Sequence, residues 1–404
     1  MPQRPAHLDP IAITALTATS CLGAGLRETY ASLQSARSGL APCNFETVRL
    51  DTYIGQVSGV DDQPLPDELA RYNCRNNRLA LLGLSQDGFM AATARAIARY
   101  GARRVGLFLG TSTSGILEAE IAYRHRDPLT GLLPEAFSYA ESLDFYSVAS
   151  FVRRLLGLEG PTAVVSTACS SSAKVFAMAR RYINLGLIDA ALVGGVDSLC
   201  LTTLYGFHSL QLTSALPCRP FDARRDGISI GEAAAFALLE RISASGDPGA
   251  LALLGVGESS DAYHISAPHP EGAGARLAMQ AALDDAGLAP SAVDYINLHG
   301  TGTPSNDSAE SKAVEAIFGS ETPCSSTKGA SGHTLGAAGA FEVVVSALAI
   351  THRFMPAGLH CDTLDPNCHL DYLRVNRASA PRVALSNSLG FGGTNCSVLL
   401  GRLT

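Results

Sequence analysis

Short runs of valine, isoleucine and leucine alternate with longer stretches rich in alanine and leucine along most of the chain. The short runs have the length and composition of buried strands, and several of the longer stretches between them have the length of helices. This alternation is typical of an α/β architecture with mostly parallel strands and helices on both faces of the sheet. The predicted strands lie within residues 11–16, 104–110, 162–167, 190–195, 251–257, 294–300 and 382–388.

A polar connection divides the chain into two parts. Residues 241–250, RISASGDPGA, have the glycine, proline, serine and aspartate of a surface loop, and a new strand follows directly. We therefore predict an N-terminal half over residues 1–249 and a C-terminal half over residues 250–404. Residues 388–403 predict a strand, a glycine-rich turn and a returning strand.

Composition and charge exclude several classes of protein. The chain has 404 residues, of which 47% are hydrophobic, and a net charge of −7. A general affinity for nucleic acid is excluded because it requires a basic surface. The apolar runs are too short to cross a bilayer and the N-terminus lacks the layout of a secretory signal, so we predict a cytoplasmic protein without a membrane segment. Ten cysteines without paired spacing predict reduced thiols.

Three arginines recur at helical spacing in the segment ARYNCRNNRLALL. Arg71, Arg75 and Arg78 are separated by four and three residues and would share one face of a helix. Such a face is either simply solvated or a docking patch for an acidic partner.

One cysteine lies where a strand passes into a helix. In VVSTACSSSAKVFAMA, residues 164–179, Cys169 follows an apolar run and precedes a helical stretch. The positive end of a helix lowers the pKa of a thiol, and small neighbours leave room for an incoming carbonyl carbon. The segment alone also fits an inert buried cysteine.

Two histidines lie in glycine-rich surroundings. His299 ends an apolar strand in NLHGTGTPSNDSAE, at the sheet edge where α/β sites form. His333 shares the loop SSTKGASGHTLGAAGAFE with Lys328, just before the helix that carries Glu342. One such histidine is usually structural, but two together with a cysteine indicate a catalytic site.

Two further motifs are ambiguous on their own. The stretch SNSLGFGGTN frees the backbone around Phe391, and by itself it is also a tight hairpin turn. The pairs His360-Cys361 and Cys368-His369 offer zinc ligands, but their spacing matches no common finger and an acidic, proline-broken loop explains them equally well. We therefore predict no metal site.

Taken together, TACSSS, HGTGTPSND, KGASGHTLGAAGAFE and GFGGTN, in this order and spacing, resemble the β-ketoacyl-[acyl-carrier-protein] synthase family. The likeness covers nearly the whole chain and is closer to the synthase II and polyketide-ketosynthase branch than to synthase I. It implies a thiolase-type fold, in which two similar halves build a five-layer α-β-α-β-α sandwich, usually assembled as a homodimer.

The resemblance also implies catalytic roles. Cys169 matches the nucleophile of a Cys-His-His triad that His299 and His333 complete. The reaction would be a decarboxylative condensation of an acyl group on the cysteine with a malonyl thioester, without a metal or redox cofactor. The remaining matches are Lys328 and Glu342 as a supporting ion pair, and Phe391 as the gate and the backbone donor to the oxyanion.

Substrate contacts follow from the same resemblance. Thr301 and Thr303 match residues that bind the 4′-phosphopantetheine arm, which arrives on an acyl carrier protein, and Ser266 has the same role. Ile116 or Leu117 would set chain length by filling the acyl pocket. The face of Arg71, Arg75 and Arg78 would be part of the carrier dock.

Several alternatives remain open at this point. The chemistry fits fatty-acid elongation and a polyene or polyketide pathway equally well. A non-condensing partner subunit of a ketosynthase heterodimer would have the same fold but typically lacks the cysteine. A thiolase would need a second catalytic cysteine near the C-terminal glycine turn, where Cys396 lies on an apparent strand.

Overall fold

The computed structural model describes residues 8–242 and 248–403. Its main sheet has twelve strands. In the N-terminal half these are β1 (Ile11–Ser20), β2 (Gly23–Ala24), β5 (Val105–Gly110), β6 (Thr162–Val165), β7 (Ala190–Asp197) and β9 (Ala233–Arg241). In the C-terminal half they are β10 (Leu251–Ser260), β11 (Tyr295–Asn297), β12 (Pro323–Ser325), β14 (Asp371–Tyr372), β16 (Val383–Gly390) and β17 (Thr394–Arg402).

The two halves of this sheet repeat one topology. From the outer edge inward, the N-terminal strands run β6, β5, β7, β9, β1, and the corresponding C-terminal strands run β12, β11, β16, β17, β10, with β14 added outside β12. The neighbouring strands from β6 to β7 and from β14 to β16 pair in parallel. The pairings β7–β9, β9–β1, β16–β17 and β17–β10 are antiparallel. A short antiparallel pairing of β1 with β10 joins the halves. The predicted boundary at 249/250 lies beside residues 243–247, which fall outside the described residues, and stays a prediction.

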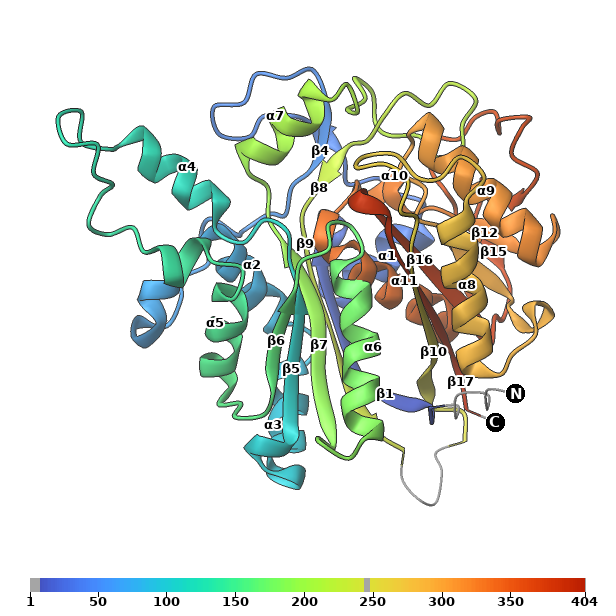
Figure 1. The fold of residues 1–404 in the computed structure, drawn as a ribbon, viewed down its shortest axis with the longest axis horizontal. Helices are drawn as coiled ribbons and strands as arrows, with labels where there is room; N and C mark the ends of the chain where they lie inside the picture. Colours follow the sequence, from blue (N-terminus) through green and yellow to red (C-terminus); the bar gives the residue numbers. More distant parts are fainter. Residues whose placement is uncertain (1–7, 243–247, 404) are drawn as a thin grey trace.

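Helices cover both faces of each half and make five layers (Figure 1). Between the halves lie α6 (Ser171–Asn184) and α11 (Ala338–His352), which contact each other and strands of both halves. The outer helices of the N-terminal half are α2 (Arg75–Leu84), α3 (Phe89–Tyr100) and α5 (Ser147–Leu156). Those of the C-terminal half are α8 (Ala273–Ala286) and α9 (Pro304–Phe318). The predicted α-β-α-β-α sandwich is therefore confirmed.

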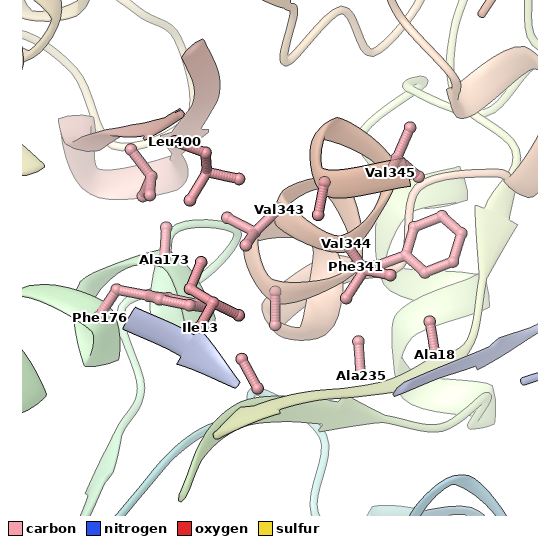
Figure 2. Close-up of a cluster of buried hydrophobic side chains, with 14 of the residues drawn as sticks. Ile13, Ala18, Ala173, Phe176, Ala235, Phe341, Val343, Val344, Val345 and Leu400 are labelled. Carbon is pink, nitrogen blue, oxygen red and sulfur yellow. The ribbon is translucent and has the colours of Figure 1, made fainter. Parts of the chain in front are cut away.

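Helix α11 forms the centre of the core. Every residue from Ala338 to Ile350 is buried. In Figure 2 its side chains Phe341, Val343 and Val344 pack among residues of β1, β9, β17 and α6, such as Ile13 and Phe176. With the preceding turn, residues 335–352 form an apolar helical stretch of 18 residues, 89% buried inside the fold. The stretch is thus longer than the sequence interpretation allowed, but it is an internal helix of the sandwich.

Many of the shorter elements lie at the carboxyl ends of the parallel strands, near the loops that carry the cysteine and histidine motifs (Figure 1). The helices among the remaining elements are α1 (Leu26–Gln34), η1 (Asp67–Tyr72), η2 (Ala102–Arg104), α4 (Ile116–Arg124), η3 (Tyr139–Leu143), α7 (Leu201–Ser209), η4 (Pro290–Ala292), α10 (Lys328–Ser331), η5 (Leu335–Ala337) and η6 (Phe391–Gly393). The short strands are β3 (Ala41–Pro42), β4 (Tyr53–Gly55), β8 (Ile230–Gly231), β13 (Phe354–Met355) and β15 (Arg377–Ala378).

Candidate active site

Cys169 lies on a sharp turn between β6 and α6. The residue before it, Ala168, has a φ of 52°, a left-handed conformation that costs a non-glycine residue energy. Cys169 is buried and is followed by the N-cap residue Ser170, whose hydroxyl bonds Thr394 Oγ1 at 3.0 Å. The thiol is therefore placed just ahead of the helix, at the position that the sequence predicts.

The pKa of this thiol shifts in the opposite direction to the prediction. Burial raises the pKa of Cys169 to about 11, because the loss of water outweighs the lowering by Lys328 and by the backbone N–H of Phe391. Asp197 and Glu342 raise it further. The expectation of a lowered pKa was wrong: without substrate the thiol is protonated, and it needs a base to become a nucleophile.

His333 is in position to be that base. Its Nε2 lies 3.0 Å from Cys169 Sγ. Burial and the nearby Lys328 lower the pKa of His333 well below its usual value, so the ring is neutral and can accept a proton.

His299 stands beside this pair with its own proton fixed. The two imidazole rings are 5.2 Å apart and nearly perpendicular. Lys328 Nζ lies 3.4 Å from Nδ1 of His299 and donates to its carbonyl oxygen at 2.5 Å. Because an ammonium faces Nδ1, the proton of the neutral ring belongs on Nε2. His299 can then donate a hydrogen bond from Nε2.

Lys328 and Glu342 form a buried ion pair under the histidines. Both side chains are almost fully buried and hydrogen-bonded to each other. The contacts of Lys328 refine its predicted role, because it holds His299 directly, while its position at the start of α10 ties it to the loop of His333.

The Cys169, His299 and His333 donor atoms also lie within 4.8 Å of one another, close enough to form a metal-binding group. A metal on Nε2 of His299 would require the ring proton on Nδ1, which faces the Lys328 ammonium. This contact disfavours a cation at the triad. Within the residues that the structure describes, the pairs at 360–361 and 368–369 do not form a metal-binding group.

The glycine-rich turn around Phe391 fits both interpretations of its sequence. It connects β16 and β17 as a hairpin, and it also lines the cavity above Cys169. Gly393 has a φ of 72°, and a Cβ there would lie 2.8 Å from Cβ of Asp261. The Phe391 ring packs against Phe207 of α7, 5.6 Å between centroids. The sequence analysis did not identify Phe207.

The cavity brings together most of the predicted substrate contacts. Cys169, His299 and His333 line it, with the buried Thr301 and Thr303. The hydroxyls of the two threonines are hydrogen-bonded to each other at 2.9 Å. Ser266 and Phe391 line the same cavity.

Other predicted residues lie outside the cavity lining. Ile116 and Leu117 begin α4 and belong to a hydrophobic cluster with Phe207 and Ile228, which do line the cavity. Cys396 is fully buried in β17 and is not part of the lining. A second catalytic thiol, as a thiolase would need, is therefore not provided by Cys396.

The arginine face predicted for docking does not form. Arg71 lies in η1 and is exposed, whereas Arg75 and Arg78 lie in the separate helix α2. Arg75 is buried and donates to both oxygens of Glu232, at 2.6 and 2.9 Å. The docking role was wrong for Arg75, because its spacing matched a solvent-facing helix but its charge is paired inside the protein. Arg78 is mostly buried and lies 3.7 Å from Glu118.

Two carboxylates of α9 hold the loop of His299, and neither role was predicted from the sequence. Glu310 accepts the backbone N–H groups of His299 and Gly300, each at 2.8 Å. Asp307 accepts the N–H of Thr301 at 3.0 Å. Their signal in the sequence was two acids, three residues apart, near the start of a helix that follows a glycine-rich loop.

Glu310 should make stability depend on pH. Burial raises the pKa of Glu310 from 4.5 to about 7, so between these values the folded protein holds a proton that the unfolded chain has lost. The stabilisation of the folded state by this proton is complete below pH 4.5. As the pH rises from 4.5 through 7, the free energy of unfolding falls by about 1 kcal/mol per pH unit. Urea unfolding from pH 5 to pH 7.5 should show a smaller slope in Glu310→Gln than in the wild type. Equal slopes would contradict this assignment.

Comparisons with known proteins agree with this geometry. The family described as Beta-ketoacyl synthase, N-terminal domain, matches residues 8–245, and its C-terminal domain matches residues 251–362. The chain is 36% identical to 3-oxoacyl-[acyl-carrier-protein] synthase 2 of Staphylococcus aureus over 318 residues, which are 73% of this chain and 76% of that protein.

Solved structures give the same result. The chain is similar to a chain of the solved complex between a ketosynthase of Xenorhabdus doucetiae and its chain length factor, with 38% identity, a TM-score of 0.87 and full coverage of both chains compared. It is also similar to a type II polyketide synthase complex of acyl-carrier protein and ketosynthase, with 25% identity, a TM-score of 0.84 and coverage of 98% of this chain and 100% of that chain. The cysteine, the two histidines and the repeated sheet are thus found in a chain that belongs to the β-ketoacyl synthase family.

Proposed function

We propose that this ketoacyl synthase joins an acyl group to a two-carbon unit from a malonyl thioester, with loss of carbon dioxide. The observation that carries the proposal is the arrangement of the triad. The Cys169 thiol is 3.0 Å from a neutral His333, and a lysine orients His299 beside them in the same cavity. A non-condensing subunit would not need this arrangement.

In the first step the acyl group moves to the enzyme. His333 takes the proton of Cys169 as the sulfur attacks the carbonyl carbon of an acyl thioester. The backbone N–H groups of Cys169 and Phe391 stabilise the oxyanion. Collapse of the intermediate expels the carrier thiolate, which takes up the proton, and leaves an acyl-cysteine.

In the second step a malonyl thioester enters along Thr301 and Thr303. For this step the neutral His333 ring carries its one proton on Nε2, after exchange with water. Breaking the C–C bond of the malonyl group releases carbon dioxide and leaves an enolate, whose oxygen accepts hydrogen bonds from the Nε2–H groups of His299 and His333. The carbanion attacks the acyl-cysteine carbonyl and displaces the Cys169 thiolate, which takes up a proton from water and restores the resting thiol. The product is a β-ketoacyl thioester two carbons longer, and the protein supplies every group of this sequence without a metal or redox cofactor.

The proposal is tested with the purified chain, an acyl-loaded carrier and a malonyl-loaded carrier. Release of one carbon dioxide per elongated product, identified by mass, supports condensation. Acyl exchange without carbon dioxide would support a thiolase-type reaction instead. If the purified chain is inactive by itself, but a related subunit becomes active when the two are mixed, the result would support a non-condensing subunit.

An acyl carrier protein is the proposed donor of both thioesters. The support is the structural similarity to a ketosynthase solved with its carrier, together with the paired threonine hydroxyls in the cavity. Of the three arginines, Arg71 still fits the dock: it pairs with Glu141, but its side chain is 76% exposed, whereas the paired Arg75 is buried.

Arg71→Glu should raise the KM for the loaded carrier a few-fold at low salt, because exposed charges at an interface mainly affect encounter. The effect should fade as the salt concentration rises. Arg103→Glu is a matched control, since its side chain is 86% exposed but lies before β5, at the amino end of the strand. Equal KM values for the two variants would exclude Arg71 from the dock.

We further propose a second ketosynthase-fold chain as the partner at the outer edge of the N-terminal half. Strand β6 ends the sheet there, all its residues are half-buried, and one side of it has no partner strand within the described residues. The arm, residues 125–146, stands out from the body between α4 and α5 (Figure 1). It exposes Leu129 and Leu132, at 94% and 69%. An unpaired strand edge and exposed leucines in the same half fit a chain-to-chain interface.

Replacing Leu129 and Leu132 together by aspartate should therefore weaken association by at least tenfold, because both leucines would be buried in the interface. Native mass spectrometry and sedimentation measure the loss, with the chain alone and with a related subunit. Leu185→Asp is the control, since Leu185 is 72% exposed at the far end of α6. Unchanged assembly in the double variant would exclude the arm.

A further inference from the structure

One buried carboxylate outside the triad contacts two separate segments of the site. Asp197 ends β7 and is fully buried. Its Oδ1 accepts the hydroxyls of Thr111 and Thr113 at 2.8 and 3.0 Å, and the N–H groups of Ser112 and Thr113 at 2.6 and 3.0 Å. Its Oδ2 accepts the N–H of Gly336 at 2.5 Å and the hydroxyl of Ser112.

The two segments have different tasks in the proposed reaction. Residues 111–113 form the turn after β5, and α4 begins a few residues later with Ile116 and Leu117, the residues expected at the acyl pocket. Gly336 follows His333 by three residues, in η5. A Cβ on Gly336 would lie 2.8 Å from Oδ2 of Asp197, so the two groups are in close contact.

We propose that Asp197 is a positioning residue that fixes the His333 loop against the acyl-pocket turn, so that one carboxylate sets both the condensation rate and the accepted chain length. The inference rests on the proposed condensing function. All six hydrogen bonds of Asp197 come from donor groups. Only a carboxylate can accept such bonds at both of its oxygens. An asparagine has the same shape but would turn an amide N–H₂ toward the donors of one segment, and that segment would lose its anchor.

The test compares Asp197→Asn with the wild type on a series of acyl-loaded carriers. We expect the condensation kcat to fall about tenfold to 100-fold with little change in the KM for the malonyl carrier, because small displacements of catalytic groups have effects of this size. We also expect the preferred acyl length to shift. Asp222→Asn is the control: it is a buried carboxylate that accepts the N–H groups of Thr363 and Arg224 and touches neither segment.

A second readout does not depend on turnover. The charge of Asp197 raises the pKa of Cys169, alongside Glu342 and against Lys328 and the Phe391 N–H. The pH profile of Cys169 alkylation by iodoacetamide should therefore move to lower pH in Asp197→Asn and stay unchanged in Asp222→Asn. If Asp197→Asn does not fold, Ser112→Ala, which removes one hydroxyl donor, should show a smaller change in kcat and chain length.

The inference is overturned if the foldable variants of Asp197 and Ser112 have the kcat and the length profile of the wild type, or if they lose only stability, which is the result expected for Asp222→Asn. Its failure is distinct from failure of the proposed function, which would appear as a wild-type chain that elongates nothing.

Discussion

Replacing Cys169 by alanine should abolish chain elongation, with no acyl group found on the protein. Among the described residues Cys169 is the cysteine that lines the cavity with both histidines, so its thiol is the expected attachment point of the acyl group. Slow carbon dioxide release from the malonyl carrier should persist, since His299 and His333 remain to stabilise the enolate. Product mass and carbon dioxide release, measured in parallel, separate the two activities.

The matched control for this substitution is Cys43→Ala, a free and partly exposed thiol that does not line the cavity. It should elongate like the wild type. Full elongation by Cys169→Ala would rule out the covalent mechanism.

Replacing either histidine by alanine should lower the condensation rate by 10²- to 10³-fold, or about 2.7–4 kcal/mol, because each removes one donor to the enolate oxygen. The two variants should differ in acylation. His333 lies 3.0 Å from the thiol and takes its proton, whereas His299 has no such contact. His333→Ala should therefore slow acylation of Cys169, and His299→Ala should leave it nearly intact.

The rate of acylation of each histidine variant is measured in a single turnover by intact mass, separately from its rate of condensation. His125→Ala, a substitution of an exposed histidine on the arm, is the control and should change neither step. Equal acylation defects in the two cavity variants would contradict the separate roles.

The strands could be predicted from local signals, whereas the five layers and the Cys-His-His triad were implied by the resemblance of four ordered motifs to a known family. Buried strands are short apolar runs, and every predicted run contains a strand of the sheet. The expectation of mostly parallel strands was wrong for the centre of the sheet, where β1 and β10 pair antiparallel with each other and with β9 and β17. Strand β9 was not predicted, because its alanine-rich sequence AAAFALLER has little β-propensity and is held by pairing on both sides with β1 and β7.

The features that could not be predicted from the sequence depend on contacts between residues far apart in the chain. Arg75 has the spacing of a surface arginine, yet Glu232, 157 residues away, pairs with it inside the protein. The thiol of Cys169 has a helix start behind it, but burial by distant loops dominates its pKa. Glu310 and Asp307 became recognisable as loop anchors only when α9 was placed under the His299 loop.

We propose that a sulfur atom of this chain carries the growing acyl group between two half-reactions. To test this directly, the protein is mixed with an acyl-loaded carrier alone, its intact mass is measured, and malonyl-loaded carrier is then added. We expect a gain of one acyl mass on the peptide that contains Cys169, then its loss in step with carbon dioxide release and appearance of the longer product. An acyl group on another residue, or elongation without any acylated protein, would contradict it.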